Sequence, residues 1–242
     1  IEDRKDKIYS PLPVEEQERV MLLEINNNYL KNNKEAIISE INRLPGICES
    51  LKMEGRRNEE LKDTTGINYY MDVIYADANY AEFFHIPVQG KEISADNDQT
   101  VFISPALQEM LNRNGMYNGN LIINNQSYAI GGSIPNTYQA DAYNPFGRDI
   151  GSVWKVSHEG NMYYFRIAPH ADIAETIQKM NNIIHKYAPS TLPSSLHQLT
   201  DEKFNRLAHI ETTGVLATVL AVISILLVVF SIYSAISLDT QN

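Results

Sequence analysis

Cysteine is almost missing from this chain of 242 residues. Cys48 is the one cysteine in the sequence, so no disulfide can form within the chain. The sequence also lacks the C-x-x-C and H-E-x-x-H patterns that hold zinc. A lone cysteine just after Pro45 and Gly46 is typical of a small buried side chain. No structural metal is therefore expected.

Basic residues are scarce as well. The chain carries 20 Lys and Arg against 30 Asp and Glu, a net charge of -10, and shows no basic run. Proteins that bind nucleic acids need Lys and Arg to neutralise phosphates. A nucleic-acid partner is not expected.

Motifs for catalysis are absent from the sequence. It contains no G-x-x-x-x-G-K-[ST] loop, so ATP is expected on a separate partner and not on this chain. It also lacks the G-x-S-x-G pattern of a nucleophilic serine. The histidines, at positions 85, 158, 170, 185, 197 and 209, have no spacing suited to a metal. The sequence predicts no enzyme activity, no catalytic residue, and no cofactor or metal bound by this chain.

Charge is missing altogether from residues 212–238. A Lys or Asp at the centre of a bilayer costs about 2.5–3.5 kcal/mol, and about 20 apolar residues cross the hydrocarbon core. A buried helix of a soluble domain is the alternative, but such helices rarely stay uncharged on every face. Residues 212–238 are therefore predicted to form a transmembrane helix in contact with lipid.

Small residues recur at helical spacing on one face of this predicted span. They are Gly214, Ala217, Ala221, Ser224, Ser231 and Ala235. Small side chains let transmembrane helices approach closely. This face predicts a partner helix, and hence a homodimer or a paired permease.

The residues before the span are predicted to belong to the same helix. Thr200 followed by Asp201 is typical of an N-cap with an acid in the first turn. Helical apolar spacing then continues through Phe204, Leu207 and Ile210. A helix over 201–238 would be about 57 Å long, more than the hydrocarbon core needs. Residues 200–211 therefore predict a rigid stalk.

Two strand–helix–strand units occupy the ends of the remaining chain. The first is predicted as a strand over 20–25, a helix over 33–44 and a strand over 47–53. The second is predicted as a strand over 162–167, a helix capped by Asp172 and a strand over 192–199. Two such units predict an α+β protein with a ferredoxin-like split βαβ arrangement.

Residues 71–159 separate these units and predict an inserted, mostly β subdomain. Asn124-Asn125 and residues 158–161 are both predicted as hairpin turns, and residues 136–150 as an exposed loop. Residues 1–17 form a charged lead-in with little structure. The chain begins at Ile1 without a signal peptide, so we expect a first span to precede it in a longer protein.

Three stretches, in this order, carry a family resemblance. They are DVIYADANYAEFFHIPVQGKEI (72–93), VFISPALQEML (101–111) and NLIINNQSYAIGGSI (120–134). Together with the run from LTDEKFNRL into the span, they resemble the FtsX-like permeases of bacterial ABC transporters with a MacB-like periplasmic core domain. The chain departs from that pattern at Gly132-Ser133, where the family has an aliphatic pair.

The resemblance implies a porter-like subdomain formed by 18–70 and 160–199, and a sabre-like subdomain over 71–159. It implies a bacterial inner-membrane protein whose main domain, 18–199, lies in the periplasm. A cytoplasmic ABC ATPase would drive the stalk by mechanotransmission, for export or efflux, with an export partner in the periplasm or outer membrane. Relatives differ in substrate, so the resemblance names none.

Two other functions fit a domain next to a membrane span. One is the extracytoplasmic sensor of a histidine kinase or chemoreceptor, and the other is a passive anchored interaction domain. A basic coupling segment after residue 242 would indicate a permease, whereas a HAMP-type linker would indicate a sensor.

Overall fold

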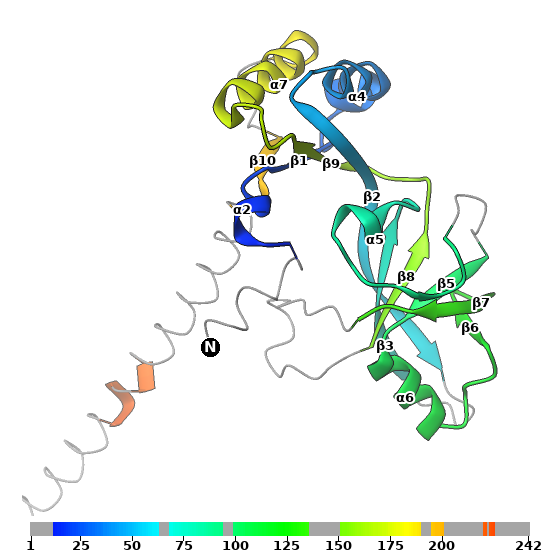
Figure 1. Cartoon of the computed structure of the whole chain (residues 1–242). Helices are drawn as coiled ribbons and strands as arrows, with labels where there is room; N and C mark the ends of the chain where they lie inside the picture. The colour runs from blue at the N-terminus through cyan, green and yellow to red at the C-terminus, as the bar shows by residue number, and fades with distance from the viewer. Residues whose placement is uncertain are drawn as a thin grey trace, which may run out of the picture. The chain divides into compact units, whose positions relative to one another are not determined.

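The protein is described by a computed structural model, shown in Figure 1. The structure describes residues 12–62, 68–93, 99–135, 151–189 and 195–200, together with residues 220–221 and 223–225. Contacts within the chain form two compact units, Ile1–Thr200 and Asp201–Asn242.

The first unit combines one large mixed sheet with helices, which confirms the predicted α+β class. Its strands are β1 (Val20–Glu24), β2 (Ile47–Lys62), β3 (Asn68–Ala76), β4 (Gln89–Gly90), β5 (Thr100–Ile103), β6 (Asn120–Ile123), β7 (Gln126–Ser133), β8 (Ser152–Val156), β9 (Met162–Ile167) and β10 (Leu196–Gln198). Its helices are α2 (Val14–Gln17), α3 (Asn28–Asn32), α4 (Lys34–Asn42), α5 (Tyr80–Phe83), α6 (Pro105–Arg113) and α7 (Ile173–Tyr187). The strand order is β10-β1-β9-β2-β3-β8-β5-β7-β4, and β6 pairs with β7.

One end of the sheet is a split βαβ part, made of β10, β1, β9 and the first half of β2. All its strand pairs are antiparallel, and β1 and β9 each lie between two strands of this part. The predicted strand–helix–strand units therefore interleave, in the order of a ferredoxin-like sheet. Helices α4 and α7 lie on the same face (Figure 1), where Ile37, Met180 and Phe165 share one apolar core.

Local sequence explains where these helices begin. The Asp172 side chain accepts a hydrogen bond of 2.8 Å from the Glu175 backbone N–H, which confirms the predicted N-cap of α7. The helix predicted over 33–44 is α4, which spans Lys34–Asn42. A short helix that was not predicted, α3, precedes it, and it begins where the Asn27 side chain accepts a bond of 3.0 Å from the Leu30 N–H.

Strand β2 is longer than predicted and serves both ends of the sheet. Its first half pairs with β9, and its second half, from Gly55 to Lys62, pairs with β3. The change of partner follows an irregularity between Met53 and Gly55, where Gly55 has a φ of 123°. Only glycine adopts such a conformation without strain.

The rest of the sheet is the inserted part, comprising the second half of β2 and β3 to β8 with α6. It contains parallel pairs, β3 with β8 and β5 with β7, beside antiparallel ones. Leu107 of α6 packs with Val73 and Val153 in its core. Ser104, fully buried at the start of α6, accepts a 2.8 Å bond from the Ser152 N–H and so ties α6 to β8.

The two predicted hairpin turns have different outcomes. Asn124 and Asn125 have φ values of 49° and 63° and join the paired strands β6 and β7, which confirms the first hairpin. The second prediction is wrong, because β8 pairs with β3 and β5 whereas β9 pairs with β1 and β2. Residues 157–161 instead lead the chain from the inserted part to the split βαβ part.

The structure corrects three further predictions. The lead-in is not without structure, since Val14–Gln17 is helical and Leu12 is buried in the core. Leu199 and Thr200 are both helical, so Thr200 is not the N-cap that the sequence predicted. Cys48 is exposed instead of buried. The predicted loop over 136–150 lies outside the described residues.

Candidate functional site at the junction of the sheet

Most of the site residues predicted from the sequence lie outside the described residues. This holds for the stalk residues Asp201, Phe204, Leu207 and Ile210, and for Gly214, Ala217, Ser231 and Ala235 of the span. Ala221 and Ser224 are described, and both are helical and exposed. Among the residues that the structure describes, no helix is both long enough and apolar enough to cross a membrane. The packing face and the span stay predictions.

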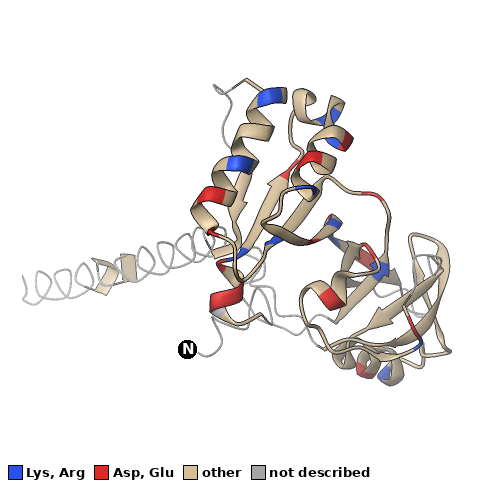
Figure 2. Ribbon diagram, turned by 45° about the horizontal axis from the view of Figure 1, so that its top comes forward, with Lys and Arg blue, Asp and Glu red and all other residues tan. Residues whose placement is uncertain are grey.

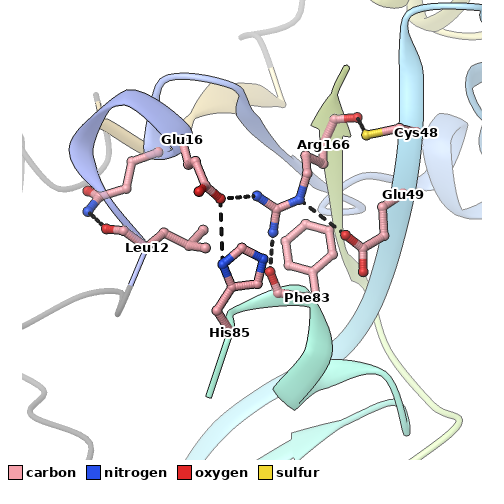
Figure 3. A network of polar contacts seen from close by, with 8 residues as sticks. Leu12, Glu16, Cys48, Glu49, Phe83, His85 and Arg166 are labelled. Carbon is pink, nitrogen blue, oxygen red and sulfur yellow. Dashed lines mark hydrogen bonds and ion pairs between the residues drawn. The ribbon is translucent and has the colours of Figure 1, made fainter. Parts of the chain in front are cut away.

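The structure instead draws attention to the place where the split βαβ part meets the inserted part. We call this the junction and define it by Arg166 of β9, Glu49 of β2, Glu16 of α2, and Phe83 and His85 of the α5 region. These residues come from segments far apart in the sequence and converge on one guanidinium group (Figure 3).

Arg166 joins four of these segments. Its Nη1 lies 3.0 Å from Glu16 Oε2, and its Nε lies 3.1 Å from Glu49 Oε2. Its Nη2 donates to the Phe83 carbonyl oxygen, and the guanidinium lies 4.8 Å from the centre of the Phe83 ring. The Arg166 side chain is only 12% exposed. The guanidinium is therefore mostly shielded from water, whereas its partners Glu16 and Glu49 are 40% and 29% exposed.

His85 adds a second contact to Glu16. Its Nδ1 lies 3.7 Å from the same carboxylate oxygen that Arg166 binds. His85 follows α5 in the left-handed region, with a φ of 53°. The Ile86 N–H bonds to the Ala81 carbonyl at 2.7 Å and the His85 N–H bonds to the Glu82 carbonyl at 3.1 Å, which is the Schellman pattern of helix ends.

An aromatic cluster continues from the junction into the inserted part. Ring centres are 5.5 Å apart for Tyr164 and Phe84, and 5.4 Å apart for Phe84 and Tyr80. The chain of rings then runs from Tyr80 to Trp154 at 5.4 Å and on to Phe102 at 5.3 Å. It therefore connects β9 with α5, β8 and β5 through buried edge and tilted contacts.

A charged pair lies beside this cluster. Arg56 of β2 and Asp72 of β3 are 3.0 Å apart, with side chains 21% and 16% exposed. Burial raises the pKa of the neighbouring Tyr80 hydroxyl. The pair bridges the two strands just past the place where β2 changes partner.

Residues near both ends of the described part of the first unit belong to one apolar cluster. Leu12, which precedes α2, shares one apolar cluster with Leu199, which follows β10. The Gln198 side chain also donates to the Glu18 carbonyl oxygen. A displacement of either end therefore acts on the same group of residues.

These contacts are suited to holding elements together. A guanidinium stays protonated in proteins, so Arg166 is not suited to act as a general acid or base. Among the described residues, no group of three or more His, Cys, Asp and Glu could hold a metal ion. Figure 2 shows acidic and basic residues mixed along the helices and strands.

The sequence analysis missed the junction, although one signal was present. Arg166 is the charged residue in the strand MYYFRI, whose other residues are uncharged. A charge in a buried strand needs a partner. Its partners Glu16, Glu49 and Phe83 could not be identified from spacing because they lie 150, 117 and 83 residues away.

Comparison with solved structures shows which known fold this chain shares. The structure is similar to the periplasmic region of MacB from Actinobacillus actinomycetemcomitans, at 8% identity and a TM-score of 0.53, covering 77% of this chain and 91% of that one. The chain has the fold of that region. No family model matches the sequence, and no curated protein matches it.

Two further solved structures are similar at lower scores. One is the extracellular domain of the noncanonic ABC-type transporter YknZ from Gram-positive bacteria, at 10% identity and a TM-score of 0.49, covering 74% of this chain and 97% of that one. The other is a domain of a putative permease protein from Porphyromonas gingivalis, at 12% identity and a TM-score of 0.46, covering 75% and 89%.

Proposed function

We propose that this chain is the extracytoplasmic core of an FtsX-like permease subunit of a bacterial ABC transporter. The observation that carries the proposal is the fold shared with the MacB periplasmic region over 91% of that region. The resemblance of residues 72–93, 101–111 and 120–134 to the same family supports it from the sequence alone. A sensor domain has no comparable support.

In this proposal the domain works by mechanotransmission. An ABC ATPase on the cytoplasmic side closes on ATP, and the movement reaches the domain through the stalk, residues 200–211, from the span, residues 212–238. The meeting of Leu12 and Leu199 in one cluster supports this, because both ends of the unit then act at one place. The work serves export or efflux and is done outside the inner membrane.

In this proposal each part of the sheet corresponds to one subdomain of the permease family. The split βαβ part corresponds to the porter-like subdomain, and residues 71–159 to the sabre-like subdomain. Strand β2 supports a stiff connection between them, because its 16 residues run through both. The small-residue face of the span would pair two permease copies, and an export partner in the periplasm or outer membrane would receive the motion.

The test measures the movement of the inserted part during ATP hydrolysis, as a distance between spin labels. Ile122 of β6 is 57% exposed, so Ile122→Cys can carry a spin label, with Cys48→Ser and other cysteines removed. In the complete transporter in lipid vesicles, the distance between the labels of two copies should change when ATP and vanadate are added. The substitutions Leu207→Pro and Ile210→Pro should abolish the change while ATP hydrolysis continues, because they break the predicted stalk helix.

The matched control replaces the same two residues with alanine. Leu207→Ala and Ile210→Ala keep the helix and should preserve the change in distance. An ATP-dependent change that survives both proline substitutions would refute the stalk as the path of transmission.

A further inference from the structure

Glu16 holds the N-terminal helix α2 against both parts of the sheet. We propose that Glu16 is a releasable latch, which joins α2 to α5 through Arg166 and His85 and opens when the N-terminal segment is displaced. The link between opening and transport rests on the proposed function, whereas the latch itself does not.

The carboxylate is well placed for this role. One oxygen, Glu16 Oε2, lies 3.0 Å from Arg166 Nη1 and 3.7 Å from His85 Nδ1. Figure 3 shows the carboxylate between these two groups. The Glu16 side chain is 40% exposed, so water can reach it and take over its bonds. A partly exposed ion pair of this kind opens at a modest free-energy cost.

Arg166 does not depend on Glu16 alone. If Glu16 leaves, the guanidinium still binds Glu49 at 3.1 Å and still donates to the Phe83 carbonyl oxygen. No unpaired charge is left behind, which is the usual penalty for breaking a shielded pair. Opening therefore leaves β2, β9 and α5 joined and removes one of the contacts that hold α2, while buried Leu12 and the bond from the Gln198 side chain to the Glu18 carbonyl oxygen remain.

The backbone of His85 indicates that its side chain has a role. The position that follows a helix in the left-handed region favours glycine, because a Cβ atom there is strained. His85 occupies it with a φ of 53°, and the contact of its side chain with Glu16 is the interaction that a glycine would lack. Strain kept at one position points to a function for the side chain.

A second unfavourable feature lies in α2 itself. Gln17 is 1% exposed, and its Nε2 donates to the Leu12 carbonyl oxygen at 2.6 Å. Its Oε1 is buried and finds no donor among the described residues. A buried acceptor without a partner destabilises the seated helix, and water would satisfy it once α2 moved away. Glu16 therefore helps to hold α2 in a position where one buried acceptor finds no donor among the described residues.

Hydrogen exchange of the 242-residue chain tests the latch without ATP or substrate. The variant Glu16→Ala is compared with Glu15→Ala, which removes the same charge from the exposed neighbouring position of α2. Glu16→Ala should speed exchange at least fivefold in two segments, α2 and residues 83–86 after α5. Glu15→Ala should change neither segment. Equal exchange in the two variants would overturn the proposal.

A second variant separates the latch from a purely structural brace. His85→Gly relieves the left-handed strain and should raise the midpoint of thermal unfolding by about 2–4 °C. It should also speed exchange in α2, because Glu16 loses one partner. A lower midpoint, or unchanged exchange in α2, would overturn the role given to His85. Neither result depends on transport, so failure here leaves the proposed function to its own test.

Discussion

The two parts of the sheet differ in how far apart in the sequence their paired strands lie. In the split βαβ part, whose one face is covered by α4 and α7, every strand pair joins distant segments, such as Val20 with Arg166 across β1 and β9. The inserted part has distant pairs too, such as Asp72 with Ser152 across β3 and β8, but it also pairs strands that follow one another in the chain, such as β6 with β7. Contacts between distant segments form more slowly than local ones, so the sheet of the split βαβ part depends more on distant strands meeting.

Their polar contacts differ as well. In the split βαβ part, Lys186 of α7 binds Glu40 of α4 at the surface, at 2.6 Å, and this bond lowers the pKa of Glu40. In the inserted part, the Tyr75 hydroxyl donates at 3.0 Å to Glu59, which is buried. Arg56 and Asp72 are likewise shielded. Shielded pairs on neighbouring strands oppose a slip in register, because a slip would leave them without partners.

The largest expected effect tests whether the two parts unfold together. Phe165→Ala empties a fully buried site in the split βαβ part and should cost about 3–5 kcal/mol of unfolding free energy. Trp154, the one tryptophan in the chain, lies in the inserted part and reports on it by fluorescence. Because β2 is shared, fluorescence and circular dichroism should give the same urea midpoint.

Leu107→Ala provides the reciprocal measurement from the core of the inserted part. It should cost about 2–5 kcal/mol and again move both signals together. A lowered midpoint by circular dichroism alone in Phe165→Ala, with unchanged tryptophan fluorescence, would mean that the two parts unfold separately.

A smaller effect is expected at the charged pair beside the junction. Asp72→Asn leaves Arg56 shielded without its carboxylate and should cost about 3 kcal/mol, measured by urea unfolding. The control Glu109→Gln breaks an exposed pair with Arg113 on α6 and should cost less than about 0.5 kcal/mol. Equal costs would show that the pair does not hold β2 to β3.

The smallest effect concerns alkaline pH. Burial, with Glu35 and Glu159 nearby, raises the pKa of Tyr163 from 10.0 to about 12. The folded protein therefore keeps a phenol proton that the unfolded chain loses, so stability falls as the pH rises from 10 to 12. Tyr163→Phe should flatten this fall, measured as urea midpoint against pH, and the exposed Tyr29→Phe should not.

The inserted part should show the same sign over a pH range that also begins near 10 and extends further. Burial and the hydrogen bond to Glu59 raise the pKa of Tyr75 further than that of Tyr163. Tyr75→Phe should therefore leave a loss of stability near pH 11 that comes from Tyr163. A profile that flattens fully with Tyr75→Phe would contradict the separate contribution of the split βαβ part.

The sequence predicted elements of the split βαβ part better than the second half of β2, which belongs to the inserted part. Strand β9 has the predicted bounds, 162–167, and Asp172 caps α7 as predicted, since alternation and capping are local properties. The second half of β2 was missed because it is rich in charge. Its charges become compatible with a strand only when β3 supplies Asp72 and Tyr75 as partners.

The sequence by itself determined the local elements: the α+β class, the interleaved strand–helix–strand units, the Asn124-Asn125 turn and the Asp172 cap of α7. Tertiary structure alone decided that β8 and β9 pair with different strands and that β2 pairs with strands of both parts of the sheet. It also decided that Arg166 binds Glu16, Glu49 and Phe83. The reason is physical. Periodicity and capping act over a few residues, whereas a shielded charge takes whichever partners the folded chain places beside it.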